Sequence, residues 1–184
     1  MMPTTASRDD WAQPLAETDL FGVEAPTPPK ATERSVLDAL ALRYGRQNGN
    51  GPRYAFGEHV KSEAGFWAQR SADLIAIDLW PSSGCAMHGH EVKVSRSDWL
   101  RELKDPTKAE AFRPYMDFWW LVVSDLHIVR DDMPAGWGLI VAYPDGTTRI
   151  TKRAARITPL PMTRSMQAAF ARAVAKTAER RAAR

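Results

Sequence analysis

Asp73, Glu91 and Lys93 are the residues of this chain whose types and spacing best suit a chemical role. Two carboxylates at adjacent strand ends make an oxygen-rich site for a hard divalent cation such as Mg2+. A lysine one pleat away from them can hold a phosphate group or orient a water molecule. These parts suit metal-assisted hydrolysis of a phosphodiester, in which the ion polarises a phosphoryl oxygen and lowers the pKa of a bound water.

Two short apolar runs carry these residues, and a segment containing Pro, Ser and Gly separates the runs. The first covers residues 74–80 and the second leads into Glu91, which predicts two strands joined by a turn. Because side chains alternate along a strand, Glu91 and Lys93 point to one face. Asp73 and Asp78 point to opposite faces, so at most one of them can join Glu91. A half-buried hairpin with a surface Glu–Lys pair would give the same short pattern.

The same residues resemble the signature of the PD-(D/E)XK nuclease superfamily. Asp73 matches the first acid and Glu91-Val92-Lys93 matches the second part, while Ala72 stands where the signature has proline. A longer match, made of residues 70–76 and 91–99, is similar to MmcB-type DNA-repair proteins and their bacteriophage-encoded relatives.

This likeness runs from about Tyr54 to Ser124 and continues more loosely through residues 136–140. It implies an α/β fold of the restriction-endonuclease type, in which helices flank a mixed sheet. It also implies an Mg2+- or Mn2+-dependent nuclease that hydrolyses DNA phosphodiester bonds in the repair or recombination of a bacterium or phage. A non-catalytic DNA-binding repair scaffold with the same fold is the alternative from another class, and RNA is the alternative substrate.

The resemblance also implies a role for each residue of the signature. Asp73 and Glu91 would be catalytic and would hold the ion, together with the backbone carbonyl of Val92. Lys93 would orient the attacking water or stabilise charge at the phosphate. Glu58 is expected to assist as a third metal-binding acid, because MmcB-like proteins have an acid at the matching strand position. Glu33 competes with it, since other branches of the superfamily take an acid from the first helix.

Basic residues that cluster after Lys93, together with Arg70 before the Asp73 strand, are expected to form a DNA-binding mouth. Lysine and arginine that contact phosphates give salt-sensitive, sequence-independent affinity for DNA. The alternative is an ordinary solvated helix face or salt bridge, because Glu102, Asp105 and Glu110 are interleaved with the basic residues. The residues assigned to DNA contact are Arg70, Arg96, Lys104 and Lys108.

Hydrophobic periodicity and caps predict the remaining elements. Helices are expected at 32–44, at 99–104, from Thr107 and at 164–184, and strands at 54–60 and 117–124. The apolar run at 117–124 should pair parallel to the Glu91 strand. A short strand or edge is expected at 127–129, followed by a hairpin that joins 139–143 to 147–151 through Pro144-Asp145-Gly146.

The chain is expected to divide into three parts. Residues 1–30 are rich in Pro, Thr, Ala, Asp and Glu and are predicted to be a disordered tail. Residues 31–158 are predicted to form the nuclease-like domain, and 159–184 a basic C-terminal helix. In the tail, Leu20 and Phe21 resemble the anchor of the short peptides that dock on a sliding clamp, although an incidental apolar pair has the same pattern.

Composition also limits the kinds of protein and of binding site that this chain can be. The 184 residues carry a formal net charge of +3, so a nucleic-acid surface must come from local clustering of charge. The single cysteine, Cys85, has no partner for an internal disulfide, which fits a cytoplasmic protein. No apolar run approaches the ~18 residues of a membrane helix. His88 and His90 are expected on the strand face opposite Glu91, and no zinc-finger spacing is present.

Overall fold

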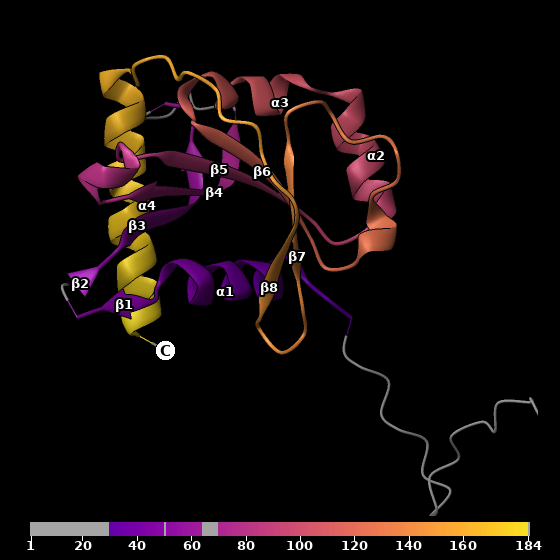
Figure 1. The fold of residues 1–184 in the computed structure, drawn as a ribbon, viewed down its shortest axis with the longest axis horizontal. Helices are drawn as coiled ribbons and strands as arrows, with labels where there is room; N and C mark the ends of the chain where they lie inside the picture. The colour runs from indigo at the N-terminus through magenta and orange to yellow at the C-terminus, as the bar shows by residue number, and fades with distance from the viewer. Residues whose placement is uncertain (1–29, 50, 64–69, 184) are drawn as a thin grey trace, which may run out of the picture.

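The computed structural model describes residues 30–49, 51–63 and 70–183, and the statements below concern these residues. At its centre lies a six-stranded sheet with the order β3-β4-β5-β6-β7-β8 (Figure 1). A separate two-stranded ribbon pairs β1 (Gln47–Asn48) with β2 (Gly51–Pro52). The strands of the large sheet are β3 (Tyr54–Lys61), β4 (Ser71–Asp78), β5 (Met87–Lys93), β6 (Phe118–Val123), β7 (Gly138–Ala142) and β8 (Thr148–Lys152).

The sheet is mixed, as expected for the restriction-endonuclease type of α/β fold. β5, β6 and β7 run parallel to one another, and the other neighbours are antiparallel. The parallel pairing of β6 with the Glu91 strand is therefore confirmed, with Glu91 opposite Leu121. The connection between β5 and β6 passes through α2 (Arg96–Lys104) and α3 (Thr107–Glu110), which lie beside the end of β5 that carries Lys93 (Figure 1).

Two apolar cores lie on the two faces of the sheet. α1 (Glu33–Tyr44) begins with a capping box between Thr32 and Ser35 and buries Leu37 and Leu40 against one face. On the other face, Trp99 of α2 is fully buried within a larger cluster of apolar side chains. Because side chains alternate along a strand, successive residues of β4 and β5 point to opposite cores.

β5 shows this alternation at the residues of interest. His90 and Val92 face α1, where His90 Nδ1 lies 3.1 Å from the Leu74 carbonyl and Nε2 lies 2.8 Å from the Tyr44 hydroxyl. Burial lowers the pKa of His90 to about 3, so the ring is neutral at ordinary pH. Glu91 and Lys93 face the opposite layer, toward α2 and α3. The predicted separation of the histidines from the acid and lysine is therefore confirmed.

The C-terminal helix belongs to the same domain as the sheet. α4 (Arg164–Ala182) begins at the residue predicted for the terminal helix, within the predicted C-terminal part 159–184, and packs along β3. The hydroxyl of Thr177 accepts a hydrogen bond of 3.0 Å from the backbone N–H of Glu58. At Gly57, an added Cβ would lie 2.9 Å from the backbone nitrogen of Val174, so the helix approaches the strand as closely as glycine permits.

One expected strand is wrong. Residues 127–129 do not form a strand or edge, because Leu126–Ile128 is a short 3₁₀ helix. The Asp125 carboxylate accepts a 2.8 Å hydrogen bond from the His127 N–H, which caps this turn locally. The predicted tail, including Leu20 and Phe21, lies outside the described residues. None of the helices described has the combination of length and apolar sequence that crossing a membrane requires.

The Gly57 contact gives a test of how α4 is held. Gly57→Ala is expected to lower the free energy of unfolding by about 1–3 kcal/mol, because backbone rather than a flexible side chain must move. Gly49→Ala is the matched control, since an added Cβ there meets no atom of the described residues within 4 Å. Urea unfolding measures both variants, and equal stability of the two would contradict the close packing of α4 on β3.

Candidate active site

Asp73 and Glu91 lie where the backbone pairing of β4 with β5 ends. The paired residues run from Ile77 opposite Met87 to Leu74 opposite His90. Just beyond the last pair, the Asp73 side chain replaces the backbone partner, because its Oδ2 accepts a 2.7 Å hydrogen bond from the Val92 N–H. The two strands thus separate around a wedge with a carboxylate on each side.

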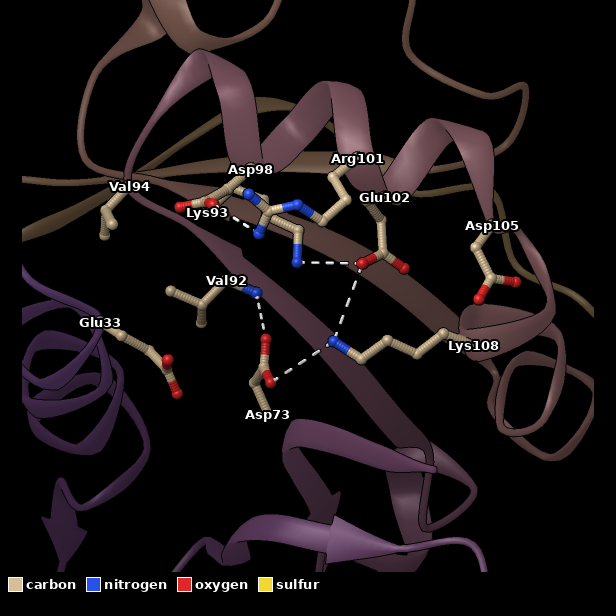
Figure 2. Close-up of a pocket in the computed structure, with 10 residues that line it drawn as sticks. All are labelled: Glu33, Asp73, Val92, Lys93, Val94, Asp98, Arg101, Glu102, Asp105 and Lys108. Atoms are coloured by element: carbon tan, nitrogen blue, oxygen red, sulfur yellow. Dashed lines mark hydrogen bonds and ion pairs between the residues drawn. The ribbon is translucent and has the colours of Figure 1, made fainter. Parts of the chain in front are cut away.

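Two lysines contact the carboxylates in and beside this wedge, and Figure 2 shows their contacts with Asp73 and Glu102. Lys93 Nζ donates to Glu91 Oε1 and lies 3.0 Å from Glu102 Oε2. Lys108 Nζ also donates to Glu91 Oε1 and lies 3.9 Å from Asp73 Oδ1 and 3.7 Å from Glu102 Oε2. The ammonium group of Lys108 therefore lies between the carboxylates of Asp73 and Glu91, in the position that a cation shared by both would take.

The cluster is buried and leaves two acceptor atoms without a partner. Glu91 is 1% exposed, and Asp73 and Lys93 are each 9% exposed. Among the described residues, Glu91 Oε2 and Glu102 Oε1 are buried without a hydrogen-bond partner. Most buried polar atoms in proteins are hydrogen-bonded, so two orphaned carboxylate oxygens in one cluster mark a place suited to an additional positive group.

Burial and like charge also shift the protonation of the cluster. Burial, followed by the nearby Asp73 carboxylate, raises the pKa of Glu91 to about 8. Burial alone would lower the pKa of Lys93 and of Lys108, but the neighbouring carboxylates outweigh it and raise both. Each ammonium group also has a second carboxylate partner besides Glu91, because Lys93 contacts Glu102 and Lys108 lies near Asp73.

The wedge opens into a cavity of about 400 Å3 between α1, β5 and the α2–α3 segment. Glu33, at the start of α1, lines this cavity together with Asp73 and Lys108, whereas Glu91 lies behind the two lysines. Figure 2 shows Glu33 and Lys108 on opposite sides of Asp73. Of the two acids considered as a third metal-binding residue, Glu33 is the one that faces the cavity.

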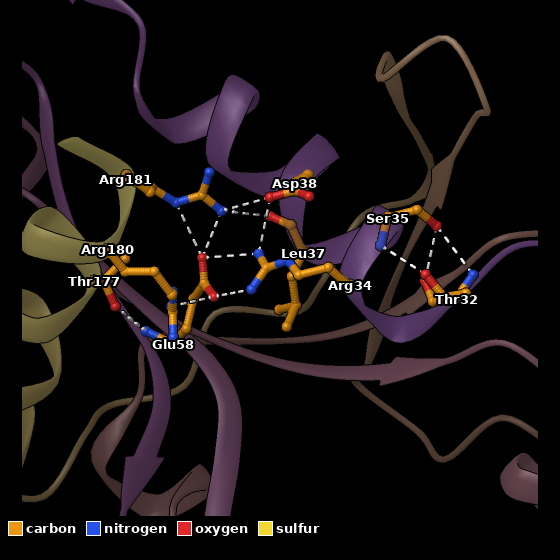
Figure 3. A network of polar contacts seen from close by, with 9 residues as sticks. All are labelled: Thr32, Arg34, Ser35, Leu37, Asp38, Glu58, Thr177, Arg180 and Arg181. Atoms are coloured by element: carbon orange, nitrogen blue, oxygen red, sulfur yellow. Dashed lines mark hydrogen bonds and ion pairs between the residues drawn. The ribbon is translucent and has the colours of Figure 1, made fainter. Parts of the chain in front are cut away.

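Glu58 lies elsewhere, in a cluster of arginines (Figure 3). Its buried carboxylate accepts hydrogen bonds from Arg34 of α1 at 2.6 Å and from Arg180 and Arg181 of α4 at 2.5 Å each. The expectation that Glu58 binds the ion is therefore corrected, because its oxygens are already engaged by three cations. Through these hydrogen bonds, Glu58 joins β3 to α1 and α4.

The four residues assigned to DNA contact have different surroundings. Lys108 reaches into the wedge, and Lys104 is exposed on α2. Arg70 lies at the rim, 3.1 Å from Asp105 and 2.6 Å from the Thr107 hydroxyl. Arg96 is turned away from the mouth, because it donates to the Ile128 carbonyl and pairs with Asp132. Arg96 is therefore corrected from a phosphate contact to a structural residue.

Sequence reasoning assigned no site role to Glu102 or His59, which the structure brings to this region. Glu102 lies three residues after the buried Trp99, so both share the inner face of α2, and this spacing was a usable signal. His59 follows Glu58 on β3, and its backbone has φ of 52°. The alternation of an ordinary strand does not predict the direction of a side chain in that left-handed conformation.

Comparisons with known proteins bear on the fold. A scan against protein-family models finds no match, and no curated protein matches the sequence. Among solved structures, a protein of unknown function from Silicibacter pomeroyi matches with a TM-score of 0.54 and 19% sequence identity, over 81% of this chain and 87% of that chain. At this identity the likeness shows the fold alone, a six-stranded mixed sheet flanked by helices.

The arginine cluster predicts a pH-dependent contribution to stability. Burial alone would raise the pKa of Glu58, but Arg34 and Arg181 outweigh it and lower that pKa to about 2. Since the folded value lies below the ordinary 4.5, the contribution is complete above pH 4.5 and is lost as pH falls toward 2. Glu58→Gln should therefore cost about 3 kcal/mol at pH 7, and the difference from the wild type should shrink between pH 4.5 and 3.

Denaturant unfolding across pH 7 to 3 measures this difference. Glu63→Gln is the matched control, because Glu63 is an exposed acid on the same side of the molecule, and its effect should stay within about 0.5 kcal/mol. A Glu58→Gln penalty that did not change with pH would contradict the assignment of a charged Glu58 to the arginine cluster.

Proposed function

We propose that this protein is a metal-dependent deoxyribonuclease that hydrolyses phosphodiester bonds, with Asp73 and Glu91 as the ion-binding carboxylates. One observation carries the proposal: the two carboxylates come from neighbouring strands, face the same layer and already share the cationic Lys108. A pair of carboxylates that only stabilised the fold would not need to be buried together, because their mutual repulsion raises the free energy of the folded state.

The donor set suits a hard divalent cation such as Mg2+ or Mn2+. Asp73 and Glu91 offer carboxylate oxygens, and Glu91 Oε2 has no partner among the described residues. The Val92 N–H points to Asp73, and in an extended strand the N–H and C=O of one residue face the same neighbouring strand. By this geometry the Val92 carbonyl would face the same wedge and would offer the ion a third oxygen.

Each charged residue has a role in this proposal. A bound ion would polarise a phosphoryl oxygen and lower the pKa of a coordinated water. Lys93, held by Glu91 and Glu102 beside the cavity, would orient the attacking water and stabilise negative charge that develops on the phosphate. Lys108 would leave its place between the two acids and contact a phosphate, which its long side chain on the cavity rim permits.

The choice of DNA, and of a repair or recombination role in a bacterium or phage, comes from the resemblance to MmcB-type proteins. The exposed Lys104 and the rim residue Arg70 would add phosphate contacts beside the mouth. The single cysteine fits a cytoplasmic location. Docking on a sliding clamp through Leu20 and Phe21 stays a prediction.

A non-catalytic DNA-binding scaffold is the second candidate, and one observation favours it. Lys93 and Lys108 neutralise much of the charge of Asp73, Glu91 and Glu102, so the cluster is stable in this form without an added cation. In a scaffold, the lysines would keep these contacts permanently and the exposed basic residues alone would bind nucleic acid.

A cleavage assay separates the two candidates. Single-stranded, nicked, branched and duplex DNA, with an RNA strand for comparison, is incubated with the protein and Mg2+ or Mn2+. We expect metal-dependent cleavage by the wild type, and a loss of about 100-fold or more in Asp73→Asn and in Lys93→Ala. Asp131→Asn, an exposed aspartate away from the wedge, is the matched control and should cleave like the wild type.

Two outcomes would count against the nuclease. Binding of DNA without any metal-dependent cleavage would favour the scaffold. Cleavage that survives both substitutions would come from a contaminating enzyme. Cleavage of the RNA strand alone would keep the hydrolytic chemistry and change the substrate class.

A further inference from the structure

A second cavity, of about 690 Å3, lies on the α1 face of the sheet, in the layer opposite Glu91 and Lys93. Its walls come from the C-terminal end of α1, from strands β3, β5 and β6, and from the turn between β7 and β8. Sites for small molecules in proteins have volumes of about 300–1,000 Å3. No residue of the Asp73–Glu91 wedge lines this cavity, so the proposed nuclease chemistry does not use it.

His88 of β5 and Trp120 of β6 form a flat aromatic floor in this cavity. The indole Nε1–H of Trp120 donates a 3.2 Å hydrogen bond to His88 Nδ1, and the two ring planes differ by 19°. Because this donor and this acceptor both lie in the planes of their rings, the rings form one nearly continuous surface. Phe118, which does not line the cavity, stacks on His88 with ring centroids 4.9 Å apart and holds the imidazole in this plane.

The place of the indole depends on Gly138 of β7. An added Cβ at Gly138 would lie 2.3 Å from Cε3 of Trp120, so any larger residue would displace the ring. Tyr54 of β3 stands beside the floor, with its ring at 79° to the His88 ring and the two centroids 6.3 Å apart. A planar ring placed on the floor would therefore also have an aromatic wall beside it.

The contact with Trp120 fixes the tautomer of His88. Burial lowers the pKa of His88 to about 4, so its ring is neutral at pH 7. The indole N–H can only donate, so Nδ1 must accept and the proton of the neutral imidazole lies on Nε2. Nε2 has no hydrogen-bond partner among the described residues. The edge of the floor therefore offers an N–H donor to a ligand.

Two arginines give the cavity a positive side. Arg43 and Arg46, at the end of α1, both line it, and neither forms an ion pair with a carboxylate of the described residues. Arg43 donates a 3.3 Å hydrogen bond to the Thr148 hydroxyl. The acid that lines the cavity, Asp145, accepts hydrogen bonds from the N–H and the hydroxyl of Thr147, at 2.8 and 2.7 Å. The two guanidinium groups are therefore available to an anion, and their planar donor sets suit phosphate.

We propose that this cavity binds a nucleotide, with the base on the His88–Trp120 floor and the phosphate at Arg43 and Arg46. A nucleotide combines the planar ring, the anion and the sugar oxygens that the floor, the arginines and His88 Nε2 would contact. Stacking on aromatic side chains tolerates every base, so this arrangement does not select one base. A free nucleotide and the phosphorylated end of a nucleic-acid strand share this chemistry.

Isothermal titration calorimetry with AMP as the probe, in buffer containing EDTA, tests the site without a metal ion and without cleavage. The wild type should bind one AMP per chain. Adenosine lacks the phosphate and ribose 5-phosphate lacks the base, so each should bind at least about 10-fold more weakly than AMP. Because neither metal nor cleavage enters the measurement, its result is independent of the proposed nuclease.

Substitutions locate the binding. Arg43→Gln and Arg46→Gln should each weaken AMP binding by about 10-fold and leave adenosine binding unchanged, because each removes a charged contact with the phosphate. Arg149→Gln is the matched control, since Arg149 is an exposed arginine of β8 between the lining residues Thr148 and Ile150 and points to the other face. It should bind AMP like the wild type.

His88→Asn tests the floor separately from the arginines. Asparagine keeps an acceptor for the Trp120 N–H but lacks the ring, so binding of both AMP and adenosine should weaken. Circular dichroism checks that this variant folds. Arg46 is exposed and has no hydrogen bond or ion pair to the described residues, so Arg46→Gln keeps the test valid if His88→Asn does not fold.

The outcomes are distinct. If folded wild type does not bind AMP at millimolar concentration, or if Arg43→Gln and Arg46→Gln bind AMP as tightly as the wild type, the nucleotide site is wrong. A 5′-phosphorylated oligonucleotide distinguishes the two sources of the ligand. If it binds more tightly than AMP and loses affinity in Arg46→Gln, the site takes a strand end. If Arg46→Gln weakens the binding of AMP alone, the site takes a free nucleotide.

Discussion

Repulsion between buried carboxylates, compensated by nearby ammonium groups, is the constraint on which the rest of the site depends. Asp73 and Glu91 are brought together because the β4–β5 pairing stops at Leu74 and His90, and Asp73 replaces the missing backbone partner of Val92. Such an arrangement is stable only with positive charge close by. Lys108 supplies that charge in this structure, and a divalent cation would supply it in the proposed active form.

The surrounding elements hold this arrangement in place. The α2–α3 segment covers the wedge and contributes Glu102 and Lys108, and its buried Trp99 fixes α2 on the sheet. On the far side, the Glu58 cluster joins α1, β3 and α4, and β3 pairs with β4, the strand that carries Asp73. Glu58, which the sequence comparison suggested as a metal-binding acid, thus has a structural role that supports the proposed ion-binding residues.

The sequence predicted the features that follow from local periodicity. Strand alternation placed Glu91 and Lys93 on one face and His90 on the other, and the apolar run at 117–124 indicated a buried parallel strand. It did not predict properties that depend on contacts between distant residues. Two of the three arginines that engage Glu58 lie more than 120 positions away, on α4, and the 3₁₀ helix at Leu126–Ile128 depends on the Asp125 cap. The direction of His59 depends on a left-handed backbone that no local pattern signals.

The most direct test of the account is a crystal structure of the protein grown with Mn2+, with the ion located by its anomalous scattering. The account predicts an anomalous peak in contact with the carboxylates of both Asp73 and Glu91, with the Lys108 ammonium moved out from between them. If the crystal contains no such peak at saturating Mn2+, and Lys108 still contacts Glu91, the claim that these carboxylates form an ion-binding site is contradicted.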